Sequence, residues 1–178
     1  LSEDQFVNYY QPIVEPQTGR IIGFEALSRW IHPEKGVLLP ASFIPAAENS
    51  GLILDLGETV FRSACLQWGD WADRYGLTEG YISVNISSQQ IYDPSFPEAV
   101  GNILEETGAD PARIVLELTE SLIMLDPDIA VVIMERLRDM GLRLAIDDFG
   151  TGYSSLSYLH RFPFDILKVD RTFISGID

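Results

Sequence analysis

The sequence predicts an α/β fold built around a mostly parallel sheet. Short apolar runs alternate with longer segments of helical periodicity along the chain, which is typical of repeated strand–helix units. Runs such as IVLEL and RLAID are apolar on both faces, as parallel strands covered by helices are. The first two strands are separated only by residues 15–20, with Pro16 and Gly19. That segment is too short for a crossover helix, so the pair is expected to form a hairpin, an antiparallel departure from the sheet.

The apolar runs give the expected strands: Tyr9–Val14, Ile21–Trp30, Tyr81–Ile86, Arg113–Leu118, Leu142–Asp147 and Asp165–Val169. The helical patterns between them give the expected helices: Ser42–Asn49, Leu54–Tyr75, Phe96–Thr107, Asp128–Met140 and a short one near Ser154–His160. In the helix at 128–140 an apolar stripe with a period of about 3.6 residues is expected to face the core. It consists of Ile129, Val132, Ile133, Leu137 and Met140, and Gly141 follows as the expected C-terminal cap.

Composition limits the class of protein and its partners. The chain has 178 residues, of which 46% are hydrophobic, so one domain with a substantial core is expected. Its net charge of −15 and its lack of a Lys/Arg cluster argue against a nucleic-acid polymer as partner. No apolar run is long enough to cross a bilayer. A cytoplasmic location is expected, with the cytoplasmic part of a membrane-anchored protein as the alternative. An anionic ligand would need cations between itself and the protein.

Several common types of site are disfavoured by the sequence. The single cysteine, Cys65, lies in an apolar stretch and is expected to be a buried structural thiol. His32 and His160 have no metal-ligand spacing and are expected to be structural. No Gly-Lys-Ser/Thr follows the glycines of FGTGYSS, and no Gly-x-Ser-x-Gly elbow is present, so neither a Walker loop nor a serine nucleophile is supported.

Acidic and amide residues recur at the ends of the expected strands: Glu25, Asn85, Glu117, Glu120, Asp147 and Asp148, with Lys168 in the last strand. The carboxyl ends of strands build the active site of an α/β barrel. A carboxylate between apolar neighbours, such as Glu117, is costly to bury without a counter-charge. Each one alone could be an exposed residue of an edge strand, but several converging strand ends indicate a site. Because the donors are all oxygen, Mg²⁺, Mn²⁺ or Ca²⁺ is favoured over zinc.

The adjacent pair Asp147–Asp148 favours a two-metal centre. At the end of a strand the chain can turn so that both side chains reach one site, where two metals clamp the two oxygens of a phosphoryl displacement. A solvated turn is the alternative for the dipeptide alone. The following segment, FGTGYSS at 149–155, is expected to be a lid over the site, with a tight turn before a Ser-capped helix as its alternative.

The sequence resembles the EAL family of cyclic di-GMP phosphodiesterases over nearly its whole length. The words that carry the resemblance occur in order: YQPI (10–13), EALSRW (25–30), FIPAAENSGLI (43–53), SVNIS (83–87), ELTES (117–121), IDDFGTGYSSL (146–156) and LKVD (167–170). The resemblance implies a TIM-like (β/α)8 barrel with one antiparallel strand. It also implies hydrolysis of cyclic di-GMP to linear pGpG in bacterial signalling.

The resemblance further implies roles for individual residues. Glu25, Asn85, Glu117 and Asp147 would bind one Mg²⁺ or Mn²⁺, and Asp147 would bridge to a second ion held by Asp148. Lys168 would position or polarise the attacking water or the phosphate, so Lys168, Glu25 and Asp147 are the expected catalytic residues. Three further residues would contact the substrate: Gln11, Leu27 and Arg29. Glu120 would anchor the DFGTGYSS loop.

One departure from the family pattern concerns the end of the chain. The family continues with an AEGVE-like word that supplies a further glutamate and with a QGY-like word, and neither occurs here. Residues 1–178 are therefore expected to be an EAL domain that lacks its C-terminal strand–helix units, truncated after about six strands, with an incomplete second metal site. The alternative function is a catalytically silent cyclic di-GMP receptor, and a third reading is an unrelated metal-dependent barrel. A homodimer and a fused sensor or diguanylate-cyclase-like domain are left open.

Overall fold

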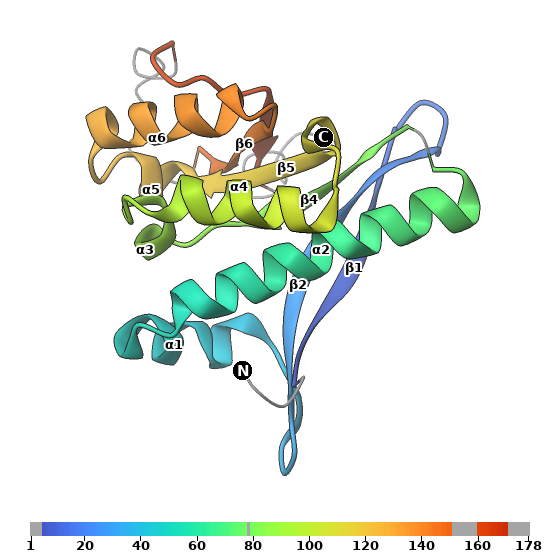
Figure 1. Ribbon diagram of the computed structural model, residues 1–178, viewed down its shortest axis with the longest axis horizontal. Helices are drawn as coiled ribbons and strands as arrows, with labels where there is room; N and C mark the ends of the chain where they lie inside the picture. Colours follow the sequence, from blue (N-terminus) through green and yellow to red (C-terminus); the bar gives the residue numbers. More distant parts are fainter. Residues whose placement is uncertain (1–4, 78, 151–159, 171–178) are drawn as a thin grey trace, which may run out of the picture.

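The computed structural model describes residues 5–77, 79–150 and 160–170, and Figure 1 shows their arrangement. The strands are β1 (Phe6–Val14), β2 (Ile21–His32), β3 (Gly36–Leu38), β4 (Tyr81–Asn85), β5 (Ile114–Thr119), β6 (Arg143–Phe149) and β7 (Ile166–Val169). The α-helices are α1 (Ile44–Ser50), α2 (Ile53–Tyr75), α3 (Ser88–Ile91), α4 (Phe96–Thr107), α5 (Glu120–Ile123) and α6 (Pro127–Asp139). Two 3₁₀ turns lie at Pro40–Ser42 and Pro111–Arg113.

These strands form one sheet in the order β1-β2-β4-β5-β6-β7, with β3 attached to β2. Every pairing from β2 to β7 along this path is parallel, whereas β1 and β3 run antiparallel to β2. The helices α2, α4 and α6 lie side by side over the outer face of the sheet (Figure 1). The predicted α/β class and the hairpin of the first two strands are therefore confirmed.

Most expected elements lie within two or three residues of their predicted bounds, and α4 has the predicted bounds. The strand β3 was not predicted from the sequence. Two strands, β1 and β3, therefore pair antiparallel with β2, where one was expected. The helices α3 and α5, which have four residues each, were not predicted either. These elements are too short to show a hydrophobic period. The short helix expected near Ser154–His160 and most of the segment 149–155 lie outside the described residues.

The apolar stripe predicted for the helix at 128–140 was partly wrong. The buried face of α6 consists of Ala130, Ile133, Met134 and Leu137, whereas Ile129 and Val132 are exposed. Helix α6 begins one residue earlier than predicted, because the carboxylate of Asp126 accepts the backbone N–H of Ile129 and Pro127 occupies the first turn. Gly141 follows the helix with a φ of 91°, as expected for a C-terminal glycine.

The main core lies between the sheet and its helices, and the strand β5 is its centre. Residues Ile114–Leu118 are all buried, including Glu117, so the prediction of a strand buried on both faces is confirmed. Cys65 is also buried in this core, and burial raises the pKa of its thiol to about 12. Its predicted structural role follows, because a thiol with such a pKa is not a thiolate at neutral pH.

A second, smaller cluster lies where β1 begins and β2 ends. Phe43, Ile53 and Leu56 are buried there, and the rings of Phe6 and Trp30 stack 5.4 Å apart beside them. The indole N–H of Trp30 donates to the side-chain oxygen of Gln5. This arrangement fixes the first described residues of the chain to the far end of β2.

The helix α2 approaches α3 unusually closely at Gly57. A Cβ atom at this position would lie 2.0 Å from the side-chain nitrogen of Gln90. Gln90 is buried and forms a capping box with Ser87, so its side chain cannot move away without loss of that cap. The glycine is therefore required by packing rather than by backbone conformation.

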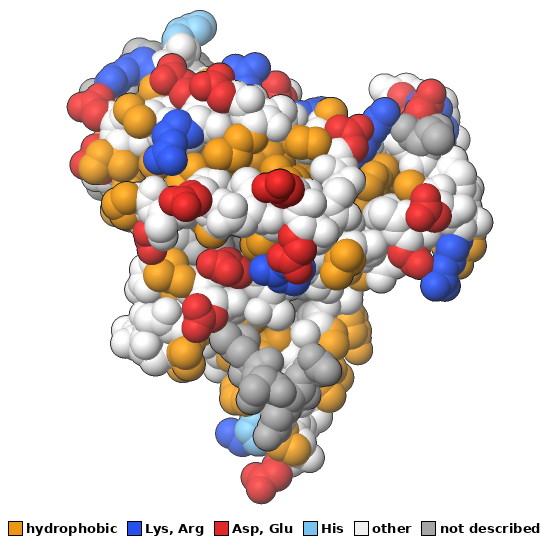
Figure 2. Space-filling model, viewed as in Figure 1, with side chains coloured by type: hydrophobic (Ala, Val, Ile, Leu, Met, Phe, Trp, Pro, Cys, Tyr) orange, Lys and Arg blue, Asp and Glu red, His pale blue; other side chains and the backbone are white. Residues whose placement is uncertain are grey.

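The outer surface shows no concentration of charge on the face of Figure 2, where Asp and Glu side chains are spread over the helices and Lys and Arg are few. No helix in the described part of the chain is both long and apolar enough to cross a membrane.

Candidate active site

The strand register brings the predicted acidic and amide residues together. Asn85 of β4 lies opposite Glu117 of β5, and Asp147 of β6 lies opposite Thr119 of β5. Glu25 of β2 lies opposite Ser83 of β4, and the side-chain amide of Asn85 donates to its carboxylate at 3.0 Å. Asn85 is the last residue of β4, and Glu117 and Asp147 lie in the second halves of β5 and β6, toward the carboxyl ends where α/β barrels form their active sites. Glu25 lies in the middle of the long strand β2, near the end of its parallel pairing with β4.

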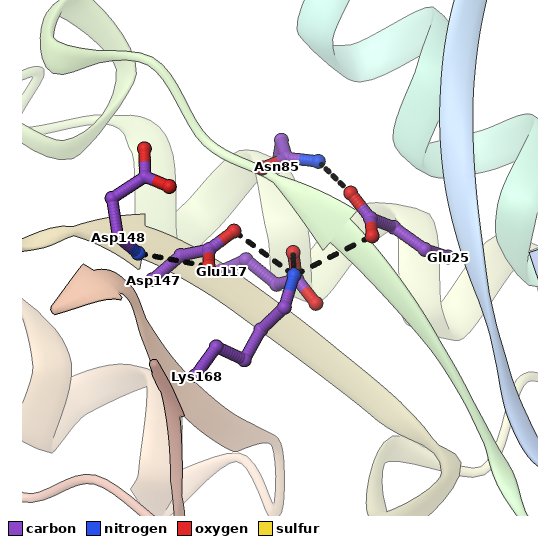
Figure 3. Close-up of polar contacts among 6 residues, drawn as sticks. All are labelled: Glu25, Asn85, Glu117, Asp147, Asp148 and Lys168. Carbon is purple, nitrogen blue, oxygen red and sulfur yellow. Dashed lines mark hydrogen bonds and ion pairs between the residues drawn. The ribbon is translucent and has the colours of Figure 1, made fainter. Parts of the chain in front are cut away.

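The ammonium of Lys168 lies among three of the carboxylates (Figure 3). Its Nζ is 2.5 Å from Glu117 Oε2, 2.9 Å from Asp147 Oδ2 and 3.4 Å from Glu25 Oε2. When all four groups are ionised, this cluster carries an excess of two negative charges. We call Glu25, Glu117, Asp147 and Lys168 the carboxylate cluster.

Burial and pairing shift the pKa values of this cluster in ways that bear on its chemistry. Burial raises the pKa of Glu117, and the nearby Lys168 only partly opposes that effect. Burial lowers the pKa of Lys168, but hydrogen bonding to Glu117 and the charges of the carboxylates outweigh it, so the pKa is raised above its ordinary value. Lys168 is therefore protonated at neutral pH and acts as a positive donor rather than as a base.

The Asp147–Asp148 pair lies near the end of β6, where the backbone departs from regular strand geometry. Asp148 has a φ of 54°, unusual for a residue other than glycine, and the pairing of β6 with β7 shifts register there. The backbone N–H of Asp148 donates to the carboxylate of Asp147. In Figure 3 the carboxylate of Asp147 points toward Lys168 and that of Asp148 points away from it. Burial, together with the charges of Asp147 and Asp170, raises the pKa of Asp148.

Glu120 is the first residue of α5. Its side chain is buried, and its Oε2 accepts the backbone N–H of Gly150 at 3.0 Å. Glu120 thus holds the second residue of the segment 149–155 that was predicted to be a lid. The loop beyond Gly150 lies outside the described residues until His160.

The chemistry of the cluster fits a hard divalent cation. The oxygen ligands that Glu25, Asn85, Glu117 and Asp147 offer here are carboxylate and amide oxygens, which Mg²⁺ and Mn²⁺ prefer. As placed around the ammonium of Lys168, no three Asp, Glu, His or Cys side chains of residues 5–77, 79–150 and 160–170 converge tightly enough to hold an ion. A bound cation would therefore require Lys168 to withdraw and the carboxylates to close in.

The residues predicted to contact substrate lie on the first two strands. Gln11 of β1 is directly opposite Glu25 of β2 and is exposed. Leu27 and Arg29 follow Glu25 at intervals of two along β2, and a strand with this period presents them on the same face. Arg29 donates from Nη1 to the carbonyl of Ser28 at 2.8 Å. Gln11, Leu27 and Arg29 therefore lie on the face of the hairpin that carries Glu25, with Arg29 farthest from it along β2.

A cavity of about 630 Å³ opens between these strand ends and the helices α1, α2 and α3. Leu27 and Asn85 line it on the sheet side, and Pro40, Ile44, Glu48 and Leu56 on the helix side. Ile44, Glu48 and Leu56 lie in helices that were predicted from the sequence, but none of the four side chains was assigned to a site. The mixture of small apolar and polar residues in FIPAAENSGLI looks like any amphipathic helix start, and only the fold shows which face meets the cavity.

Tyr9 is another residue at the site that the sequence analysis missed. The guanidinium carbon of Arg29 lies 5.4 Å from the centre of the Tyr9 ring. Tyr9 precedes Gln11 by two positions, so the alternation along β1 could have placed both on one face. His32, in contrast, is structural as predicted: its ring packs on Trp30 and its Nδ1 accepts the backbone N–H of Glu34.

Comparison with known proteins gives one consistent family. The model of the EAL domain family matches residues 1–178. The bifunctional diguanylate cyclase/cyclic di-GMP phosphodiesterase MucR of Pseudomonas aeruginosa is 45% identical over 177 residues, which cover 99% of this chain and 26% of MucR. An uncharacterized protein of Mycobacterium tuberculosis is 42% identical over 178 residues, which cover all of this chain and 58% of that protein. The chain thus spans only part of the length of these relatives.

Solved structures of similar fold belong to the same family. The MucR phosphodiesterase in complex with c-di-GMP superposes with a TM-score of 0.93 at 44% identity, over 99% of this chain and 71% of that one. The EAL enzyme Bd1971, in a form bound to cAMP and cyclic di-GMP, gives a TM-score of 0.90 at 33% identity, over 99% of this chain and 48% of that one. The resemblance drawn from the ordered sequence words is therefore confirmed, and the chain belongs to the EAL domain family.

Proposed function

We propose that this chain is the catalytic part of a metal-dependent phosphodiesterase that hydrolyses cyclic di-GMP to linear pGpG. The observation that supports it most directly is the carboxylate cluster, in which three carboxylates surround one lysine. The cluster itself does not line the cavity, but Asn85, which donates to Glu25, does. The likeness to MucR, whose phosphodiesterase was solved with c-di-GMP, supports the choice of substrate. A fused domain such as the diguanylate cyclase named for MucR is part of the same proposal.

In this proposal the strand-end residues hold Mg²⁺ or Mn²⁺. Glu25, Asn85, Glu117 and Asp147 would hold one ion, and Asp147 and Asp148 would contribute to a second. When bound, such ions lower the pKa of water and stabilise the negative charge that develops on a phosphoryl group. The excess negative charge of the cluster would attract these cations, and the cations would then allow an acidic protein to bind an anionic phosphodiester.

The remaining site residues bind and orient the reacting groups. Arg29 suits a phosphate because its planar guanidinium can donate two parallel hydrogen bonds. Lys168, protonated for the reasons given above, donates to the attacking water or to a phosphate oxygen. Hydrolysis consumes one water: its oxygen forms a bond to phosphorus, the bond from phosphorus to one ribose oxygen breaks, and that oxygen receives a proton. The ring opens to a linear dinucleotide with one terminal phosphate.

The test is hydrolysis of cyclic di-GMP by the intact protein that contains this chain. With Mn²⁺ or Mg²⁺, chromatography and mass spectrometry should detect pGpG, and its formation should stop in excess EDTA and in Asp147→Asn. The matched control is Asp73→Asn, which removes a carboxylate from an exposed position on α2 and should leave turnover unchanged. Activity that survives EDTA after dialysis would refute the metal-dependent mechanism. Binding of cyclic di-GMP without hydrolysis would favour the receptor alternative.

A further inference from the structure

The guanidinium of Arg29 has two neutral partners at the site. Its carbon lies 5.4 Å from the centre of the Tyr9 ring, within the distance at which a cation is attracted to an aromatic face. Its Nη1 donates to the backbone carbonyl of Ser28 at 2.8 Å. A ring and a carbonyl orient the guanidinium without cancelling its charge.

The pairing of Tyr9 with Arg29 follows from the register of the hairpin. Tyr9 lies opposite Leu27, and Arg29 lies opposite Val7, so the two side chains are diagonal neighbours across β1 and β2. The alternation of the strands places them on the face that carries Gln11 and Glu25. Tyr9 is 49% exposed, so its ring is not held there as part of the buried core.

The environment of Arg29 differs from that of most arginines in the described chain. Arg20, Arg62, Arg74, Arg113, Arg138 and Arg161 each pair with a carboxylate. Arg29 has no such partner among the described residues, and Glu25, four positions earlier on the same strand, is about 13 Å away along it. A long arginine side chain without an ion pair is free to adopt many rotamers. The ring of Tyr9 offers it one position in which the positive charge stays available.

We infer that Tyr9 is a positioning residue that holds Arg29 ready for a phosphate of the substrate. The inference rests on the proposed function, and it adds a residue that acts on substrate affinity through Arg29. Tyr9 makes its contribution before substrate arrives, because the contact exists in the protein alone.

The test compares Tyr9→Leu with Tyr9→Phe, which keeps the ring, in the intact protein. Tyr9→Leu should weaken cyclic di-GMP binding, measured by calorimetry with Ca²⁺, about three- to tenfold. It should raise KM similarly and leave kcat within about twofold, because Arg29 contacts a phosphate present before and after the transition state. Tyr9→Phe should resemble the wild type. Tyr75→Leu, which removes a tyrosine that is 70% exposed at the end of α2, is the matched control and should leave KM unchanged.

A double-mutant cycle separates action through Arg29 from direct stacking on the ligand. In an Arg29→Ala background, Tyr9→Leu should add no further loss of affinity. A loss that persists in that background, a Tyr9→Phe variant as weak as Tyr9→Leu, or a Tyr9→Leu variant that binds like the wild type would each overturn the inference.

A measurement without ligand keeps this inference distinguishable from the proposed function. The ring current of Tyr9 should shift the Nε–Hε resonance of Arg29 in NMR spectra, and the shift should vanish in Tyr9→Leu and persist in Tyr9→Phe. Absence of the shift in the wild type overturns the inference, whatever the enzyme does. A wild type that shows the shift but neither binds nor cleaves cyclic di-GMP overturns the proposed function instead.

Discussion

The ammonium nitrogen of Lys168 lies 2.5 Å from Glu117 Oε2, a carboxylate oxygen whose side chain is 1% exposed to solvent. The two residues are on β7 and β5, which are not neighbours in the sheet, since β6 lies between them. Lys168 therefore reaches across the end of β6 to neutralise a buried charge. In the proposed mechanism, a bound cation would take over this neutralising role.

The first prediction concerns Lys168→Met in metal-free protein. Loss of the ammonium leaves three carboxylates together, one of them buried, and should lower the free energy of unfolding by about 2–4 kcal/mol. Saturating Mn²⁺ should restore much of this loss, so the metal-dependent rise in Tm should exceed that of the wild type. Differential scanning calorimetry with EDTA or Mn²⁺ measures both. Lys35→Met, at an exposed position in the β2–β3 turn, is the control; an equal rise in Tm with Mn²⁺ in Lys168→Met and wild type would contradict the prediction.

The second prediction concerns pH and Glu117. Because burial raises its pKa, the folded state holds the Glu117 proton to a higher pH than the unfolded state does. The contribution of Glu117 to stability therefore falls as pH rises from about 4.3, the ordinary value for a glutamate, through the raised value. Glu117→Gln removes this titration, so the stability of the variant relative to wild type should increase across that range. Urea unfolding in EDTA at several pH values measures the difference in stability between the variant and the wild type. A difference that is constant with pH would show that the pKa of Glu117 is not raised in the folded protein.

The third prediction concerns the contact between Glu120 and Gly150. Glu120→Gln replaces a charged acceptor with a weaker, neutral one, which should loosen the turn that follows Asp148. Turnover of cyclic di-GMP should fall about tenfold, as expected when catalytic groups lose their orientation, while the free energy of unfolding changes by no more than about 2 kcal/mol. Steady-state kinetics measure this effect. Glu98→Gln, which alters an exposed glutamate on α4, should keep wild-type turnover.

The fourth prediction uses two glycines of one helix. Gly57→Ala would place its new methyl group against Gln90 and should destabilise the protein by about 1–3 kcal/mol. Gly69→Ala has open space and should stabilise it by about 0.5–1 kcal/mol, since alanine is the better helix former. Chemical denaturation measures both. In a Gln90→Ala background the cost of Gly57→Ala should largely disappear, and a cost that remains would mean that the clash lies elsewhere.

The larger elements of the fold could be predicted because their periodicity is local. A strand such as β5 is apolar throughout, and α4 is bounded by Pro97 in its first turn and by Gly108 at its end. The short elements β3, α3 and α5 could not be predicted, because three or four residues show no period. The wrong face of α6 had a different cause. Ile129 and Val132 fit a helical stripe as well as Ala130 and Met134 do, and only packing distinguishes them.

The acidic members of the site were predictable for a physical reason. A carboxylate inside an apolar strand needs a partner, so Glu25 and Glu117 stood out in the sequence, and parallel strands bring their carboxyl ends together. The central position of Lys168 depends on the distances between strands, which a sequence does not contain. Tyr9 was missed because an aromatic residue in a strand is ordinary, and its contact with Arg29 depends on the register of the hairpin.

The reversed direction of β1 has a mechanical consequence. Because β1 runs antiparallel to β2, it begins beside the carboxyl end of β2. The described chain therefore enters the sheet at the end of the strands toward which the carboxylate cluster lies. Gln5 and Phe6 are bound there to Trp30, and Phe6 packs against the cluster of Ile53 and Leu56, two residues that also wall the cavity. A pull on the backbone at Gln5 would therefore strain the cavity wall directly, with no need for transmission through the barrel.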